Sequence, residues 1–421
     1  MKTWKLGKAI AGTCLAFALT ANLAVAETTI RVAYAAGPVK NLYEGLARRF
    51  MDTHPDIKVV LDPPAVDYDD LIQRTLRQRI TNQLPDVSHQ GLNQIKALAE
   101  RGISVPLDDF IAKDPTWKNI GVPDSVTSFA SYAGKTQALP FAISGPVLFY
   151  NADLVKKAGG DPDNLPRDWD GILALGKKID ALGHGVHGLY VEYTNNSWSF
   201  QTLVGSFGGR MMSADERQIE FAGPAGMQAM TLLRRITLEG QQPAFGRDQA
   251  RASFQSGTLG ILFTASSALN SFEQSAAGKF RFVVGPIPVS SPNDRLPSGG
   301  NAIVMLTRDA AKQKAAWEYI KFAIGIQSQT EMAKATGYEP VNVAAMKDEN
   351  GLAKFIKEHP NYSVAASRMP MMTGWFSFPG ENNSRIIKAI EDNCYAVVML
   401  KLQPEEALAN MKKDVQALLP H

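Results

Sequence analysis

Apolar positions along the chain alternate between two spacings from residue 28 onward. Between residues 28 and 34 every second position is apolar, which is typical of a half-buried strand, and residues 42–50 then carry apolar side chains four apart, as a helix does. The two-residue spacing returns at 56–61 and the helical spacing at 68–80. This order of strand, helix, strand and helix predicts an α/β layer with parallel strands.

The same helical spacing recurs around residues 169–179, 317–324 and 408–418, and Pro404 occupies a favourable first position for the last of these helices. Between the periodic segments lie stretches rich in Gly, Pro, Ser and Asn, at 35–40, 84–93, 142–146, 193–198, 286–301 and 373–384. Ligands of open α/β sheets bind beyond the carboxyl ends of the strands, so these loops are where we expect a binding site.

The N-terminus has a pattern of its own. Three lysines precede an apolar run at 9–25, which ends in small residues. This pattern predicts that residues 1–26 are a secretory signal peptide. A transmembrane anchor is the alternative, but the apolar run is short and interrupted by polar residues. A lipoprotein site at Cys14 is disfavoured because residues 11–13 lack an aliphatic side chain.

Loss of this segment changes the charge. The 44 basic residues become 41, which equals the number of acidic residues, so the mature chain is formally neutral. Nucleic acid or an anionic membrane surface is therefore not expected as the main partner. Cys394 becomes the only cysteine, which excludes an intramolecular disulfide. The length of the mature chain favours two domains.

Enzyme motifs are missing from the sequence. It contains no His-Glu-x-x-His, Gly-x-Ser-x-Gly or phosphate loop. His184 and His187 lack a nearby third ligand and stand among glycines, so we expect a turn there and no metal or other cofactor. Asp168 is interpreted as a helix cap, as are other clustered aspartates. Catalysis by two carboxylates far apart in the chain stays open at this stage.

Six short motifs carry a resemblance to a known family. They are Leu84-Pro85-Asp86-Val87-Ser88, residues 145–151, residues 154–159, Pro166-Arg167-Asp168-Trp169, Phe254-Gln255-Ser256-Gly257 and residues 336–341. With these motifs in order behind a signal peptide, the chain resembles the family 1 extracellular solute-binding proteins, which include the maltose-binding and glycerol-3-phosphate-binding proteins. The resemblance extends over essentially the whole mature chain.

The resemblance implies a periplasmic binding protein fold, in which two α/β lobes are joined by crossover segments and hold a ligand in the cleft between them. On this pattern the first lobe consists of residues 27–141 and 286–322, and the second of residues 142–285 and 323–421. It also implies a periplasmic monomer that is not an enzyme, with a small solute and an inner-membrane ABC permease as partners.

Candidate ligand contacts follow from the family pattern and from the loops. Flat faces suited to a sugar ring are offered by Tyr68, Trp198, Tyr338 and Trp375. Neutral donors and acceptors are offered by Gln90, Ser144, Asn195, Ser267 and Asn301, and backbone amides by Gly299 and Gly300. Each of these side chains could instead serve the core or cap a turn.

The stretch 375–380 departs from the family pattern. It resembles the late loop in which the glycerol-3-phosphate binder directs an arginine to phosphate, but Phe378 stands near that position, and Arg385 is the nearby substitute. We therefore expect a sugar or a sugar derivative as ligand. Glycerol-3-phosphate, another sugar phosphate or a polyol, a carbohydrate-active enzyme, and a sensor that reports to a chemoreceptor remain as alternatives.

Overall fold

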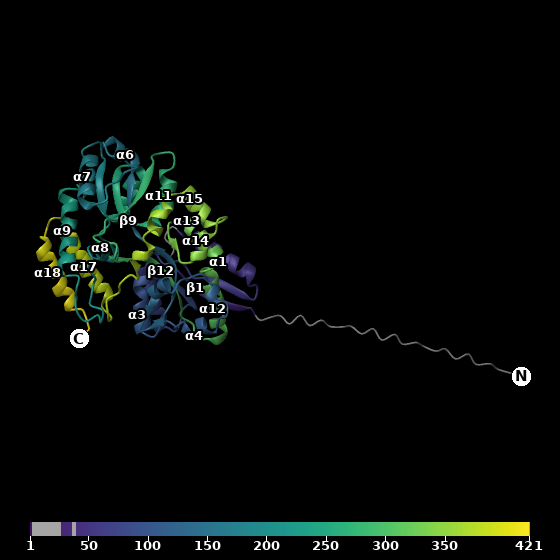
Figure 1. Cartoon of the computed structure of the whole chain (residues 1–421). Coiled ribbons are helices and arrows are strands. Elements are labelled where there is room, and N and C mark those ends of the chain that lie inside the picture. The colour runs from purple at the N-terminus through teal and green to yellow at the C-terminus, as the bar shows by residue number, and fades with distance from the viewer. Residues whose placement is uncertain (2–26, 36–38, 421) are drawn as a thin grey trace.

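Two β-sheets with separate hydrophobic cores organise the chain in the structure, a computed structural model that describes residue 1 and residues 27–35 and 39–420 (Figure 1). The predicted signal peptide lies outside the described residues, apart from Met1. No helix in the described ranges has both the length and the apolar composition needed to cross a bilayer.

The first sheet has six strands in the order β13-β6-β12-β3-β1-β2. Their bounds are β1 (Thr28–Ala33), β2 (Ile57–Leu61), β3 (Val87–Gly91), β6 (Leu139–Ser144), β12 (Gly299–Met305) and β13 (Glu339–Pro340). Strand β1 pairs in parallel with both β2 and β3, whereas β12 runs antiparallel to β3 and β6. The parallel strands predicted from residues 28–61 are thus confirmed.

Helices cover the first sheet and share its core, which includes Phe50 and Trp317. They are α1 (Lys40–Thr53), α2 (Tyr68–Ile80), α3 (Ile95–Glu100), α4 (Asp108–Lys113), α5 (Asp124–Thr127), α12 (Ala310–Ala323), α13 (Ile326–Ala335) and α14 (Val343–Lys347). A small hairpin of β4 (Ser131–Tyr132) and β5 (Lys135–Thr136) lies beside them.

The second sheet has four strands in the order β10-β7-β9-β8. Their bounds are β7 (Pro146–Asn151), β8 (His187–Val191), β9 (Leu259–Ala265) and β10 (Phe282–Pro286). Its helices are α6 (Ala152–Lys157), α7 (Trp169–Asp180), α8 (Trp198–Ser206), α9 (Pro224–Leu238), α10 (Arg247–Ser256), α11 (Leu269–Ala276), α15 (Leu352–Glu358), α16 (Tyr362–Ala366), α17 (Asn383–Val398) and α18 (Pro404–Gln416). Figure 1 shows α6, α7 and β9 in the upper part of the view and β1, β12, α3 and α12 in the lower part.

The chain passes between the two sheets three times. Gly145 connects β6 to β7, residues 287–298 connect β10 to β12, and the third passage follows α14. Residues 287–298 include β11 (Leu296–Pro297), which pairs with β14 (Met372–Thr373). The two sheets are therefore joined by three separate segments of the chain.

The third passage comes later than the sequence indicated. Residues from 323 onward were expected in the second lobe, but β13 pairs with β6, and Met332 and Val341 belong to the core of the first sheet. Gln329 also joins this segment to the first sheet, because its amide donates to the carbonyl oxygen of Phe141 in β6 over 2.9 Å. A two-residue strand such as β13 gives too little periodicity to be recognised from sequence.

The caps expected from the sequence are present. The Asp168 carboxylate accepts a hydrogen bond from the N–H of Gly171 at the start of α7, and Asp67 accepts one from the N–H of Asp70 at the start of α2. Pro404 is the first residue of α18. The acidic residues at these two helix starts thus satisfy backbone donors that the helix leaves without partners.

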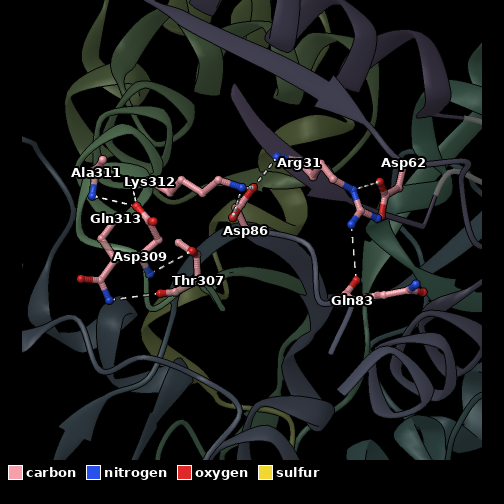
Figure 2. Close-up of polar contacts among 9 residues, drawn as sticks. All are labelled: Arg31, Asp62, Gln83, Asp86, Thr307, Asp309, Ala311, Lys312 and Gln313. Carbon is pink, nitrogen blue, oxygen red and sulfur yellow. Dashed lines mark hydrogen bonds and ion pairs between the residues drawn. The ribbon is translucent and has the colours of Figure 1, made fainter. Parts of the chain in front are cut away.

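Asp86, from the first of the six motifs, is a structural residue (Figure 2). Its buried carboxylate accepts the backbone N–H of Arg31 at 2.8 Å and pairs with Nζ of Lys312 at 3.2 Å. The Arg31 guanidinium in turn pairs with Asp62 at 2.8 Å. Asp86 therefore joins the start of β3 to β1 and to α12, which sets the relative position of central strands in the first sheet.

Candidate functional site

A cavity of about 320 Å³ lies between the two sheets and is lined by side chains from both. The first sheet and its helices contribute Asp67, Tyr68, Ser144, Gly299, Gly300 and Tyr338. The second sheet and its helices contribute Glu192, Asn195, Trp198, Arg247, Arg251, Gln255, Thr264, Ser267, Ser271 and Phe272. Trp375 lies between them and packs against both hydrophobic cores.

Two tyrosines form the polar part of the first wall. Tyr68 begins α2 and Tyr338 precedes β13, and their hydroxyl oxygens are 3.4 Å apart. Behind them the Asn301 amide donates to the Tyr68 hydroxyl over 3.0 Å. Burial, together with Tyr338, raises the pKa of Tyr68 well above its usual value, so its hydroxyl stays neutral and can donate as well as accept.

The glycines of β12 line the cavity and let this strand pack closely against β6. Gly300 has φ of +108°, and a Cβ atom there would lie 2.0 Å from the carbonyl oxygen of Ala142. The pairing of β12 with β6 shifts register between Asn301 and Ala302, next to this glycine. Only glycine fits such a position, so the backbone itself forms the surface.

One face of α10 forms the second wall. Arg247, Arg251 and Gln255 are four residues apart and all line the cavity, whereas Ala250 and Phe254 point into the core. This spacing stacks the three polar side chains along one side of the helix. Beside them Ser267 and Ser271 are also four residues apart, and the Gln255 amide donates to the Ser271 hydroxyl over 3.2 Å.

A single buried carboxylate holds both arginines. Glu192 Oε1 accepts from Nε of Arg251 at 2.5 Å, and Oε2 accepts from Nη2 of Arg251 at 3.0 Å. The same Oε2 lies 3.2 Å from Nε of Arg247 and accepts the hydroxyl of Thr264 at 2.8 Å. Both oxygens of Glu192 are thus engaged, and two guanidinium groups share one negative charge.

The two tryptophans differ in how they face the cavity. The Trp198 side chain is buried, and its Nε1–H donates to the carbonyl oxygen of Pro297 over 3.1 Å. Its ring also stacks on Phe263. Trp375 is half-buried, so more of its ring is available for contact with a solute.

Eight of the eleven predicted contact residues line the cavity. These are Tyr68, Ser144, Asn195, Trp198, Ser267, Gly300, Tyr338 and Trp375. Asn195 does so with its amide engaged, because its Oδ1 accepts the N–H of Ser199 and its Nδ2 donates to the Ser199 hydroxyl. It therefore orders the loop before α8. Contact of any of these residues with a ligand remains a prediction.

The other three predicted residues lie outside the lining. The Gln90 amide donates to Thr75 and Ser88, which joins β3 to α2 behind the wall. Asn301 supports Tyr68 as described, also from behind. Arg385 is exposed on α17 and donates to Asn382, while its neighbour Ile386 points into the core. Phe378, at the position compared with the phosphate-directed arginine, is itself a core residue.

Sequence analysis did not identify Arg247, Arg251, Gln255 or Glu192 as site residues. Arg247, Arg251 and Gln255 had a detectable signal in their four-residue spacing opposite Ala250 and Phe254. That pattern is the same for a solvated helix face and for a binding wall, so it did not identify a site. Glu192, which orients the arginines, precedes Arg251 by 59 positions.

The two histidines considered as metal ligands belong to different local structures. His184 is in a turn with φ of +56°, and His187 begins β8. Within residues 27–35 and 39–420 there is no group of three His, Cys, Asp or Glu side chains placed to hold a metal ion. The lining of the cavity combines hydrogen-bond donors, acceptors and aromatic surfaces, as binding sites for polar organic molecules do.

Comparison with known proteins gives a family match and several relatives. The family described as bacterial extracellular solute-binding protein matches residues 45–363. The sn-glycerol-3-phosphate-binding periplasmic protein UgpB of Yersinia pestis is 27% identical over 307 residues, which span 69% of this chain and 68% of that protein. The protein of the same name from Pectobacterium atrosepticum is 24% identical over 430 residues, 97% of this chain and 95% of its own.

Solved structures share the fold. UgpB from Mycobacterium tuberculosis, in complex with glycerophosphocholine, superimposes with a TM-score of 0.81 at 22% identity, covering 92% of this chain and 97% of that one. The sugar-binding protein MalE from Xanthomonas citri gives a TM-score of 0.77 at 17% identity, with 93% and 97% covered. The predicted fold class, an α/β periplasmic binding protein fold, is confirmed.

Proposed function

The chain belongs to the bacterial extracellular solute-binding proteins, and we propose that it captures a sugar or a sugar derivative in the periplasm and delivers it to the inner-membrane permease of an ABC importer. The cavity between the two sheets is the observation that supports this proposal most directly. Both sheets line it, with aromatic rings beside hydroxyl, amide and guanidinium groups. A molecule with many hydroxyl groups matches such a lining.

The proposed mechanism depends on the three passages between the sheets. We take residues 27–144 and 299–347 as the first lobe, and most of the remaining mature chain as the second. Rotation about the passages at Gly145, 287–298 and after α14 opens and closes the cavity. A solute favours the closed form only because it contacts both walls there and one wall in the open form. The closed pair of lobes then docks on the permease.

The proposed ligand contacts are the lining side chains on both walls. Tyr68, Tyr338 and Trp375 offer ring faces and hydroxyl groups, and Ser144, Ser267 and Gln255 offer neutral hydrogen-bonding groups. Gly300 offers its backbone amide. The rings supply affinity through contact with C–H faces, and the polar groups fix the orientation of the solute.

We also propose that binding occurs without turnover. The two carboxylates of the lining, Asp67 and Glu192, are both engaged: Asp67 caps α2, and Glu192 is held by two arginines and Thr264. A glycosidase needs one carboxyl group that is free to donate a proton and a second one that attacks or activates water. Prolonged incubation should therefore return the bound solute intact, and release of a hydrolysis product would contradict this reading.

Thermal unfolding of the mature chain tests the proposal. A panel of monosaccharides, disaccharides, polyols and their phosphates should contain at least one compound that stabilises the protein, by about 2.7 kcal/mol at one hundred times its dissociation constant. Loss of uptake on deletion of the permease genes, with binding by the purified protein retained, separates transport from a sensing role. A flat response to the whole panel would overturn the proposed function.

A further inference from the structure

The second wall of the cavity carries more positive than negative charge. Arg247 and Arg251 share Glu192, whose carboxylate is 1% exposed, and their own side chains are 42% and 28% exposed. Asp248 is the neighbouring acidic residue of α10, but it is exposed and does not line the cavity. Within the lining of this wall two guanidinium groups thus accompany one carboxylate, although the charge of Asp248 also acts on Arg251. Asp67, the other acidic residue of the lining, belongs to the opposite wall.

The arginines also keep donors directed away from Glu192. The contacts of Arg247 with Glu192 involve Nε, and those of Arg251 involve Nε and Nη2. Among the described residues, no hydrogen bond engages Nη1 of Arg251 or either terminal nitrogen of Arg247. The planar guanidinium presents such N–H groups in a fixed fork, which matches the oxygens of a carboxylate or a phosphate.

The carboxylate of Glu192 orients this pair before any solute arrives. It is buried and bonded to Thr264 as well as to both arginines, so the guanidinium groups are fixed relative to β8 and β9. Binding an anion then costs little side-chain entropy, because the rotamers of Arg251 are already set. Arg247 is more exposed and begins α10, where the N-terminal end of the helix also favours negative charge.

We infer that Arg247 and Arg251 bind an acidic group of the solute, so that the substrate class is a sugar or polyol carrying a phosphate or a carboxylate. The inference rests on the proposed function and makes it more specific. It differs from the expectation drawn from the late loop, since Phe378 is in the core and Arg385 is on the surface. Recognition of the anion is assigned to α10, and the hydroxyl groups of the solute face the tyrosines and Trp375.

Matched pairs of probes test this assignment by calorimetry on the mature chain. The pairs are glycerol with glycerol-3-phosphate, and glucose with glucose-6-phosphate and with glucuronate. We expect a charged member to bind at least tenfold more tightly than its neutral counterpart, and added salt to weaken the charged member more. Equal or tighter binding of the neutral members would overturn the inference and leave the proposed function standing.

Variants locate the anion site. Arg247→Gln should weaken binding of the best charged probe at least tenfold, and by a larger factor than it weakens binding of the neutral counterpart. The affinity of Arg247→Lys for the charged probe should lie between those of the native chain and Arg247→Gln, because an ammonium group keeps the charge but lacks the planar pair of donors. Arg385→Gln is the matched surface control and should change nothing. Unchanged affinity of Arg247→Gln for the charged probe would overturn the assignment, whereas absence of binding by every probe would overturn the proposed function itself.

Discussion

Glu339 accepts a hydrogen bond from the backbone N–H of Gly145, with 3.1 Å between Oε2 and N, at the first passage of the chain from one sheet to the other. The same oxygen accepts the hydroxyl of Ser266 at 3.2 Å, and Ser266 follows β9 of the second sheet. Among the described residues, no cation pairs with Glu339. Burial raises the pKa of this carboxyl to about 8, against a tendency of Ser266 and Gly145 to lower it.

Stability should therefore depend on pH through Glu339. Its pKa is about 8 in the folded chain and 4.5 in a solvated carboxyl, so the folded state binds the proton more tightly. The stabilisation that the protonated Glu339 contributes to the folded state is complete below pH 4.5 and is lost as the pH rises through 8. Between pH 5 and pH 8 the free energy of unfolding of the native chain, measured in urea, should fall relative to that of Glu339→Gln. The glutamine keeps an acceptor oxygen but cannot lose a proton.

The matched control for this comparison is Glu349→Gln, at an exposed position in the loop after α14. Its free energy of unfolding should follow that of the native chain at every pH. If the difference between native chain and Glu339→Gln stays constant from pH 5 to pH 8, Glu339 is ionised throughout and the prediction fails.

Loss of the Asp86 carboxylate should destabilise the first sheet. Asp86→Ala leaves the N–H of Arg31 without its acceptor and Lys312 without its partner, and we expect a loss of about 2–4 kcal/mol in free energy of unfolding. Asp86→Asn keeps an oxygen for the N–H and should cost roughly 1 kcal/mol. Urea unfolding measures both. If both variants lose the same free energy of unfolding, the acceptor for the Arg31 N–H does not contribute separately from the ion pair with Lys312, and the prediction fails.

A methyl group at Gly300 should damage both fold and site. Its Cβ would meet the Ala142 carbonyl oxygen, and φ of +108° is unfavourable for alanine, so Gly300→Ala should cost at least about 2 kcal/mol in free energy of unfolding. Gly246→Ala is the control, because it has open space around it and an ordinary φ. A near-neutral effect of Gly300→Ala would mean that β12 relaxes locally.

The ring of Trp375 should contribute to solute affinity. Replacing it with alanine removes the half-buried ring between the two cores, and we expect affinity for the best solute of the panel to fall roughly 5- to 50-fold. Trp375→Phe retains a ring face and should lose less. Calorimetry on folded variants, checked by circular dichroism, gives the comparison. Should Trp375→Ala bind as the native chain does, stacking is assigned to the wrong residue.

The sequence allowed the first strands and helices to be predicted because their apolar spacing is regular over 28–80. It did not distinguish Ser144, which lines the cavity, from Gln90 and Asn301, which lie behind its wall. The reason is physical: β3 and β12 are buried on both faces, so alternation of polarity cannot say which face a side chain is on.

The arginine wall was beyond sequence reasoning for a different reason. The sequence offers many acidic residues that could pair with Arg251. The ion pair with Glu192 forms only when β8 lies beside β9 in the folded chain. Spacing identifies a polar helix face, but packing decides whether water or a solute covers it.

Cys394 has a consequence for how the exported protein meets oxidants. Its side chain is buried in α17 against the second core, and burial raises the pKa of the thiol, so almost no reactive thiolate is present while the helix is packed. Cys394 can form a mixed disulfide or a covalent dimer only after α17 has unfolded or detached from the core. The rate of reaction with a thiol reagent would consequently report how often α17 opens.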